Sequence, residues 1–235
     1  MAGGKGDRPR TGCRRFVSRN WYRWDGPDDS AGYAPGSICN LQPRSDPAEV
    51  EELLEAMDLK GIADDAFEIV SAVPGMSNGS GESMRSLTQD QPLPPHLPAG
   101  RTSLRRLLTD HLDIRCSPRK SFFEWLRRLS TDEREQERLD EFLADPDEIF
   151  TYATRPARTI VETLADFREV RLPISHILEI LPPLRRRQFS IASSWGSHPG
   201  KVQLLIALVE YKTNLKIPRR GLCSSWLATL AEGGV

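Results

Sequence analysis

The sequence has few cysteines and no cluster of them. The four, Cys13, Cys39, Cys116 and Cys223, lie far apart and form no C-x-x-C pair. Structural zinc sites and disulfide frameworks need closely spaced or regularly paired cysteines. We therefore predict no metal site and no disulfide framework, and a reducing compartment with the cytoplasm as the location.

Long apolar runs and an excess of one charge are also missing from the 235 residues. The longest apolar run extends from Val202 to Val209 and is too short to span a bilayer. The basic N-terminus lacks the apolar stretch of a signal peptide. Since 32 basic residues balance 33 acidic ones, the chain offers no strong field to nucleic acid or to an anionic membrane. We expect neither nucleic acid nor a membrane as a partner.

Hydrophobic patterning predicts strands on both sides of a helical block. Strands are expected at 37–42, 66–73, 188–193 and 202–212. Helices are expected after the N-cap Asp46, with Pro47 at N1 and Glu49 in a capping box, and within the segments 102–114, 117–130, 131–144, 158–167, 173–181 and 222–230. The Gly-, Ser- and Pro-rich residues 74–100 are typical of a linker.

The order of these elements indicates the fold class. Strands that flank a helical block without β-α alternation favour an α+β fold with an antiparallel sheet or barrel. We predict an antiparallel β-barrel with an all-helical subdomain inserted at about 102–184.

The segment RRRQFSIASS, residues 185–194, carries the first candidate site. An arginine fork at Arg187 can pair with phosphate oxygens. Phe189, on the same side of a strand, can stack on a flat ring. The hydroxyl of Ser190 can both donate and accept a hydrogen bond. These residue types suit a dinucleotide that carries a ring system, although a basic turn before a core strand remains the alternative interpretation.

A second segment, RRGLCSSWLA at 219–228, predicts an anion site. Gly221 allows close approach of the backbone, and Ser224 and Ser225 suit the first turn of a helix. Free amides at a helix N-terminus attract phosphate. An ordinary capped helix is the alternative. One strand and a turn join the two segments, so together they could hold one pyrophosphate.

The two segments, in the order RRRQFSIASS, KVQLLIALVEYKT and PRRGLCSSWLA, resemble the FAD-binding domain of the diflavin reductases. The resemblance is strongest to the cytosolic NADPH-dependent diflavin oxidoreductases of iron-sulfur cluster assembly. It implies that residues 33–235 form a ferredoxin-reductase-like FAD domain, with a divergent or poorly ordered segment at 1–32. It also implies a barrel that is incomplete at both ends. Ser37 and Ala157 stand where family members usually carry Asp and Arg.

The resemblance also implies roles for single residues. Arg187 would bind the pyrophosphate of FAD, Phe189 would stack on the isoalloxazine, and Ser190 would be the catalytic residue, bonding near the flavin N5. The pyrophosphate would be wrapped by the turn from Gly221 to Ser224. The full set of implied FAD-binding residues is Arg158, Arg187, Gln188, Phe189, Ser190, Ala207, Tyr211, Gly221, Leu222, Cys223 and Ser224.

The activity that the resemblance implies is electron transfer from NADPH to FAD, to FMN, and then to an iron-sulfur protein of the anamorsin type. The sequence shows no G-x-G-x-x-G and no flavodoxin-like part, so we expect the FMN and NADPH modules outside this chain. Two alternatives stay open. The chain could be a non-catalytic helical interaction module that has lost FAD, or the FAD domain of a different diflavin reductase.

Overall fold

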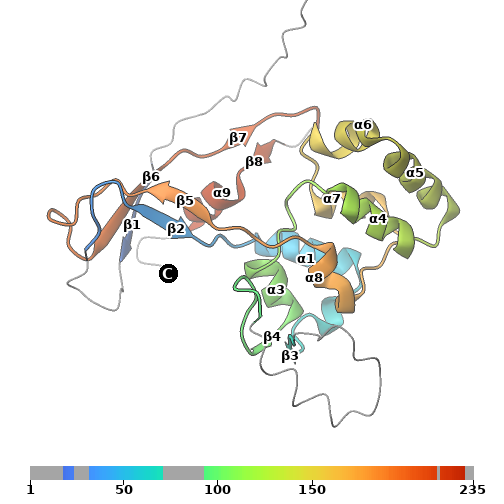
Figure 1. Ribbon diagram of the computed structural model, residues 1–235, viewed down its shortest axis with the longest axis horizontal. Helices are drawn as coiled ribbons and strands as arrows, with labels where there is room; N and C mark the ends of the chain where they lie inside the picture. The colour runs from blue at the N-terminus through green and yellow to red at the C-terminus, as the bar shows by residue number, and fades with distance from the viewer. Residues whose placement is uncertain (1–17, 24–31, 71–92, 216–217, 231–235) are drawn as a thin grey trace, which may run out of the picture. The chain divides into compact units, whose positions relative to one another are not determined.

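The computed structural model describes residues 18–23, 32–70, 93–215 and 218–230, and these divide into two compact units (Figure 1). The strand unit comprises Met1–Pro43, Thr154–Ala157 and Arg186–Val235, and the helical unit comprises Arg44–Ala153 and Arg158–Arg185. The helical unit therefore begins at Arg44, before the predicted start of the insert at about residue 102. The predicted domain boundary at residue 33 stays a prediction.

The elements are mostly short. The strands are β1 (Ser18–Arg23), β2 (Ile38–Leu41), β3 (Phe67–Glu68), β4 (Arg101–Thr102), β5 (Arg187–Ser190), β6 (Lys201–Ile206), β7 (Glu210–Tyr211) and β8 (Arg219–Arg220). The α-helices are α1 (Pro47–Ala56), α3 (Leu104–Asp110), α4 (Lys120–Leu129), α5 (Glu133–Ala144), α6 (Pro146–Ile149), α7 (Ile160–Asp166), α8 (Ile177–Ile180) and α9 (Leu222–Thr229). Two 3-10 turns lie at Lys60–Ile62 and Ile174–His176, and a π-helical turn lies at Phe150–Thr154.

The strand unit is built from antiparallel pairs. β2 pairs with β5, β1 pairs with β6, and an isolated bridge between Ile191 and Leu204 places the end of β5 beside β6. β7 and β8 form a second small pair that leads into α9. A hydrophobic cluster joins β6 to α9, and its buried members are Val202, Leu204, Ile206, Cys223 and Leu227. The α+β class is confirmed, and the described strands show four antiparallel pairs without a closed barrel.

The strand predictions at 37–42 and 188–193 are confirmed by β2 and β5. The single strand predicted at 202–212 is wrong, because it is divided into β6 and β7 around Val209. The backbone of Val209 bonds to Gly221 and Ser224 and so leaves the ladder of β6. The prediction for 66–73 shrinks to the two residues of β3, which pairs with β4 in the helical unit, while 71–73 fall outside the described residues.

The pattern analysis missed β1. Residues 18–23 pair with β6 in a register that runs from Ser18 opposite Ile206 to Arg23 opposite Lys201. The sequence SRNWYR has no clear alternation of apolar and polar residues, so its strand state follows from the partner strand. Most of the predicted linker at 74–100 lies outside the described residues.

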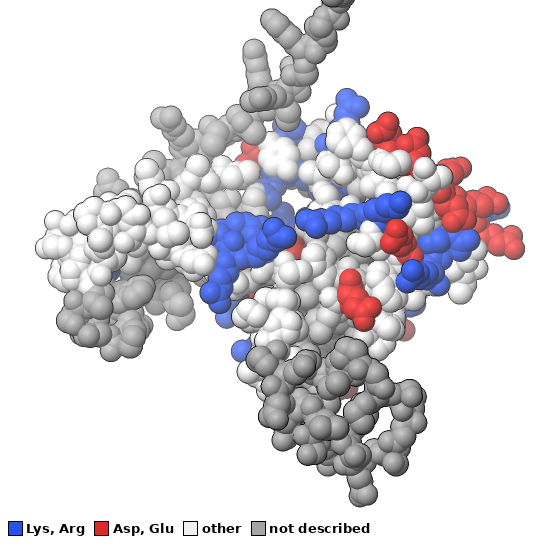
Figure 2. Space-filling model, in the orientation of Figure 1, with Lys and Arg blue, Asp and Glu red and all other residues white. Residues whose placement is uncertain are grey.

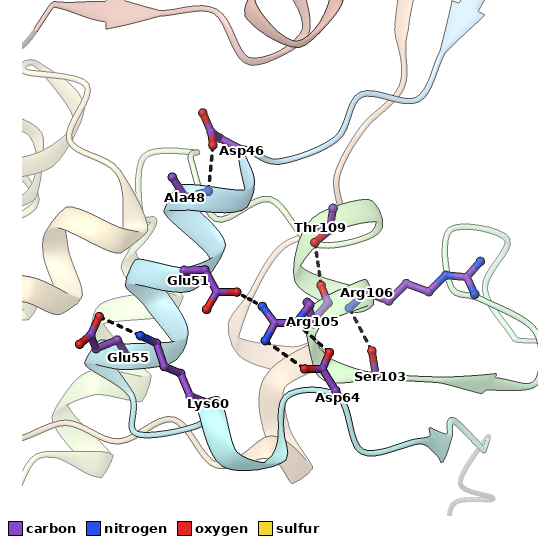
Figure 3. Close-up of polar contacts among 10 residues, drawn as sticks. All are labelled: Asp46, Ala48, Glu51, Glu55, Lys60, Asp64, Ser103, Arg105, Arg106 and Thr109. Atoms are coloured by element: carbon purple, nitrogen blue, oxygen red, sulfur yellow. Dashed lines mark hydrogen bonds and ion pairs between the residues drawn. The ribbon is translucent and has the colours of Figure 1, made fainter. Parts of the chain in front are cut away.

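Helix α1 begins where the sequence predicts its cap. Asp46 accepts a hydrogen bond from the amide of Ala48 at 2.9 Å (Figure 3), and Pro47 occupies the first turn of α1. The capping box predicted with Glu49 does not form; the Glu49 carboxylate instead pairs with Arg115 at 3.3 Å. A capping box is present at α7, where Thr159 and Glu162 satisfy each other's backbone amides.

Arg105 of α3 connects three segments of the helical unit (Figure 3). Its guanidinium pairs with Glu51 of α1 and lies 2.7 Å from the carboxylate of Asp64. Its backbone amide donates to the carbonyl of Ala63 at 2.9 Å. The ion pairs are partly exposed and contribute little stability each, so the backbone bond and the buried leucines of α3 hold the helix in place.

The helical unit has an aromatic core and a charged outer surface. Phe123 is fully buried, and its ring meets the ring of Phe142 edge to face at 5.4 Å between centroids. Figure 2 shows acidic side chains gathered over α5 and α6. Glu133 and Glu135 lie in the first turn of α5, where the helix dipole favours negative charge. None of the helices in the described part of the chain has the length and apolarity needed to cross a bilayer.

Two phenylalanines of the helical unit give a matched test of this core. Phe123→Ala is expected to lower the free energy of unfolding by about 3–5 kcal/mol, because it leaves a cavity among packed rings. Phe150→Ala should change it by less than about 0.5 kcal/mol, because Phe150 is 52% exposed. Urea denaturation of the two variants measures both values. Equal effects would show that the aromatic cluster does not form the core.

Candidate functional site

The R-x-F-S segment lies on β5, and its side chains alternate between two faces. Arg187 and Phe189 are half-buried, whereas Gln188 and Ser190 are exposed. Phe189 lies opposite Cys39 of β2 and packs against the cluster between β6 and α9. The Ser190 hydroxyl has no hydrogen-bond partner among the described residues. The strand thus offers a cation and an aromatic ring on one face and an exposed hydroxyl on the other.

The G-L-C-S turn is fastened to the chain just beyond β6. The amide of Gly221 donates to the carbonyl of Val209 at 2.8 Å. The amide of Val209 donates to the Ser224 hydroxyl at 3.2 Å, and that hydroxyl donates to the carbonyl of Gly221 at 3.1 Å. α9 begins at Leu222, and no side-chain hydrogen bond caps it. The fixed turn therefore presents the amides of a helix N-terminus.

Gly221 is required by space rather than by backbone conformation. Its φ of -69° is open to any residue. A Cβ at this position would lie 2.9 Å from the Cβ of Val209 and 2.9 Å from the Oγ of Ser224. Both atoms belong to the contacts that hold the turn, so neither can move away without loosening it.

Arg187 and the first turn of α9 lie close enough to interact electrostatically. Burial raises the pKa of the Cys223 thiol, and the positive charge of Arg187 acts against that rise in pKa. Cys223 is the second residue of α9. Phe189, two residues after Arg187 on β5, packs against the cluster that contains Cys223, so the fold brings the two predicted segments together.

The remaining predicted residues are placed as follows. Ala207 is exposed just beyond β6, Leu222 is half-buried at the start of α9, and Tyr211 is half-buried in β7 opposite Arg219. Arg158 belongs to the helical unit. The structure thus brings together Arg187, Phe189 and the turn at 221–224 within the strand unit, with Gln188 and Ser190 on the other face of β5.

Arg158 is held by a network of its own. Its Nη1 lies 2.7 Å from the Asp166 carboxylate, and its guanidinium lies 4.4 Å from the ring centroid of Tyr152. The Tyr152 hydroxyl donates to the same carboxylate at 2.6 Å. Burial and this bond raise the pKa of Tyr152, so its phenol stays protonated. The network fixes the direction of the Arg158 side chain within the helical unit.

Sequence reasoning missed Arg219, which is 8% exposed. Its Nε donates to the carbonyl of Pro156 at 3.3 Å, and both residues belong to the strand unit. Arg219 lies two positions before Gly221 and so helps to fix the strand that leads into the turn. The sequence PRRG predicts a turn, and only the buried position of Arg219 reveals this role.

The residues present fit a ligand with a pyrophosphate and a flat ring. An uncapped helix N-terminus and a neighbouring guanidinium supply positive potential and directed donors. A half-buried phenylalanine on the same face supplies a stacking surface. Because the space around Gly221 admits no side chain, its backbone stays uncovered and a ligand can approach it closely.

Gly221→Ala tests the turn, and Gly61→Ala is the control. We expect Gly221→Ala to cost about 1–3 kcal/mol in folding, because the added methyl overpacks the contact with Val209. A methyl added at Gly61 would meet no atom within 4 Å, so the Gly61→Ala variant should be neutral or slightly stabilising. Thermal unfolding measures both. A Gly221→Ala variant as stable as Gly61→Ala would contradict the packing described.

Arg187→Ala tests the contact between Arg187 and Cys223. Loss of the guanidinium should raise the pKa of Cys223 further, so the midpoint of its alkylation rate against pH should move upward. Cys39 is the control, because burial is the cause of its raised pKa. Mass spectrometry of iodoacetamide-labelled peptides follows each thiol. An unchanged midpoint for Cys223 would place Arg187 away from α9.

Comparison with known proteins agrees with this arrangement. The sequence matches the family model of the FAD binding domain over residues 21–226. It is 62% identical over 229 residues to the NADPH-dependent diflavin oxidoreductase 1 of Cryptococcus neoformans var. neoformans serotype D, covering 93% of this chain and 34% of the relative. It is 37% identical over 231 residues to the protein of that name from Bos taurus, covering 96% and 36%.

The relative of the same name from Danio rerio is 50% identical over 132 residues, which cover 54% of this chain and 22% of the relative. The chain spans about a third of the length of the curated relatives from Cryptococcus and Bos. The family model covers most of the chain, including both segments that form the candidate site. The chain therefore belongs to the FAD-binding domain family, whose cofactor is FAD, and is homologous to this part of the NADPH-dependent diflavin oxidoreductases.

Proposed function

We propose that the strand unit binds FAD between β5 and the N-terminus of α9. The observation that carries this proposal is the hydrophobic cluster in which Phe189 of β5 packs with Cys223, in the first turn of an uncapped helix. A guanidinium on β5 and the amides of this helix suit a pyrophosphate, whose charge both stabilise.

Each residue of the site has a role in this proposal. Arg187 pairs with the pyrophosphate, and the backbone from Gly221 to Ser224 wraps it. Phe189 stacks on the isoalloxazine, and the Ser190 hydroxyl bonds at the edge of the ring near N5. Further contacts come from Gln188, Ala207, Tyr211, Leu222 and Cys223, and a role for Arg158, which belongs to the helical unit, stays a prediction. When bound, FAD supplies the redox chemistry, while these residues bind and orient it.

The fold supports the proposal in a second way. The described strands are antiparallel, and β6 joins both segments of the site through one hydrophobic cluster. We propose that the strand unit is part of an antiparallel β-barrel, with the helical unit inserted between β2 and β5. Closure of the barrel would shelter the pyrophosphate and the ring from water, which strengthens the charged contacts.

The activity of the whole protein follows from the relatives. Their name, NADPH-dependent diflavin oxidoreductase, supports an enzyme that takes electrons from NADPH and passes them through FAD to FMN. The resemblance in the two motifs further supports a cytoplasmic iron-sulfur protein of the anamorsin type as the acceptor.

The direct test is a titration of the chain with FAD, followed by the change in flavin absorbance between about 350 and 500 nm. Saturable binding at one FAD per chain is expected. A chain that is folded by circular dichroism and leaves the flavin spectrum unchanged would favour the non-catalytic helical module instead. A different diflavin reductase would bind FAD equally and would differ in the acceptor that the complete enzyme reduces.

Arg187→Ala tests the assignment at the level of one residue. It should weaken FAD binding by about 1.5–3 kcal/mol, the range for a hydrogen bond that involves a charged group. Arg186→Ala is the control, because Arg186 is exposed and points to the other side of the strand. Titration calorimetry gives both dissociation constants. Equal affinities of the two variants for FAD would show that Arg187 does not bind the cofactor.

A further inference from the structure

The hydroxyl of Tyr33 joins three segments of the strand unit. It donates to the carbonyl of Lys201 at 3.0 Å and lies 2.5 Å from the Ser193 hydroxyl. The Ser193 oxygen in turn accepts from the amide of Gln203 at 2.9 Å. With the Tyr33 proton directed at Lys201, the Ser193 hydroxyl donates to Tyr33, and the bonds form one continuous chain from Gln203 to Lys201.

The ring of Tyr33 is fixed as firmly as its hydroxyl. It packs against the cluster between β6 and α9 and meets the ring of Trp195 edge to face at 5.6 Å. A Cβ at Gly32 would lie 2.6 Å from the Trp195 ring, so the backbone before Tyr33 lies directly on the indole. These contacts tie the segment around Tyr33 to the hairpin between β5 and β6, residues 191–200.

These contacts lie directly after the predicted flavin-ring residues. Ile191 follows Ser190, and its amide donates to the carbonyl of Ser37 at 3.1 Å. The amide of Ala192 donates to the carbonyl of Gln203 at 2.8 Å. The Tyr33 network holds the next residue, Ser193, against the start of β6. It therefore pins the register in which the end of β5 lies on β6.

β6 is also the element that carries the second half of the site. Beyond its last residue the chain reaches Val209, whose backbone bonds to Gly221 and Ser224. The register of β5 on β6 thus sets the distance from Phe189 to the N-terminus of α9. A slip of one residue would also turn the side chains of β5 to the opposite faces.

We propose that Tyr33 and Ser193 are positioning residues that set the span between the ring contacts and the pyrophosphate contacts. The inference rests on the proposed FAD site. A ligand that reaches both sets of contacts depends on their spacing, whereas a ligand that touches one set does not. The network should therefore matter for FAD and leave its fragments unaffected.

The experiment compares Tyr33→Phe, Ser193→Ala and the double variant of this chain with FAD, riboflavin and adenosine diphosphate as ligands. Each single variant should raise the dissociation constant of FAD by about two- to tenfold, because each removes the bond between Tyr33 and Ser193 and one further bond of the network. The double variant should be close to either single one, because both remove the same network. The dissociation constants of riboflavin and adenosine diphosphate should stay unchanged.

Ser194→Ala is the matched control, because Ser194 is exposed on the same hairpin and its hydroxyl has no hydrogen-bond partner among the described residues. It should bind FAD as the unchanged chain does. Equal FAD affinity in Tyr33→Phe and the unchanged chain would overturn the inference. An equal rise in the dissociation constants of FAD and adenosine diphosphate would overturn it too, because a general loss of order in the fold would weaken the binding of both ligands.

The experiment distinguishes a failure of the proposed FAD site from a failure of the inference about Tyr33 and Ser193. An unchanged chain that does not bind FAD contradicts the proposed function, and the inference falls with it. FAD binding that is insensitive to both Tyr33 and Ser193 contradicts the inference alone. If Tyr33→Phe does not fold, Ser193→Ala removes the bond between Tyr33 and Ser193 from the other side and leaves the bond from Tyr33 to Lys201 in place.

Discussion

The backbone of Val209 is the constraint on which the site depends. Its carbonyl accepts from Gly221 and its amide donates to Ser224, so both polar groups are satisfied by the turn that opens α9. A backbone residue that is paired in this way cannot extend a neighbouring ladder, and β6 ends before it. The same two bonds fix the helix N-terminus just beyond the end of β6.

The strand unit and the helical unit are stabilised in different ways. The helical unit has the larger hydrophobic core, with Phe123 and its aromatic neighbours at the centre. The strand unit has a small cluster on β6 and α9, and its short strands gain stability from the pairing of distant segments. A small core beside exposed strand faces leaves room for a bound group to contribute to stability, because a ligand that binds only the folded chain stabilises it.

The sequence predicted most of the local structure, and the reasons are visible in particular segments. α4 and α5 carry apolar residues at helical spacing, and α1 starts at the cap Asp46 that the sequence predicts. The strand β5 was predicted from the change of period after Arg187. The resemblance in the two motifs predicted the FAD-binding family, which the family model confirms.

Other features depend on contacts between distant residues, and pattern analysis could not supply them. β1 is a strand because β6 pairs with it, while its own sequence has no alternation. The break at Val209 falls inside the single strand predicted at 202–212 and has its cause in residues 221 and 224. Tyr33 and Ser193 belong to no motif in the sequence, and only the hydrogen bond between these distant residues shows that they link separate segments of the strand unit.

The measurement that tests the account most directly is a crystal structure of this chain with FAD. The account predicts the pyrophosphate at the N-terminus of α9, within hydrogen-bond reach of Arg187, with the isoalloxazine on Phe189. FAD bound with its phosphates away from α9 and Arg187 would contradict it.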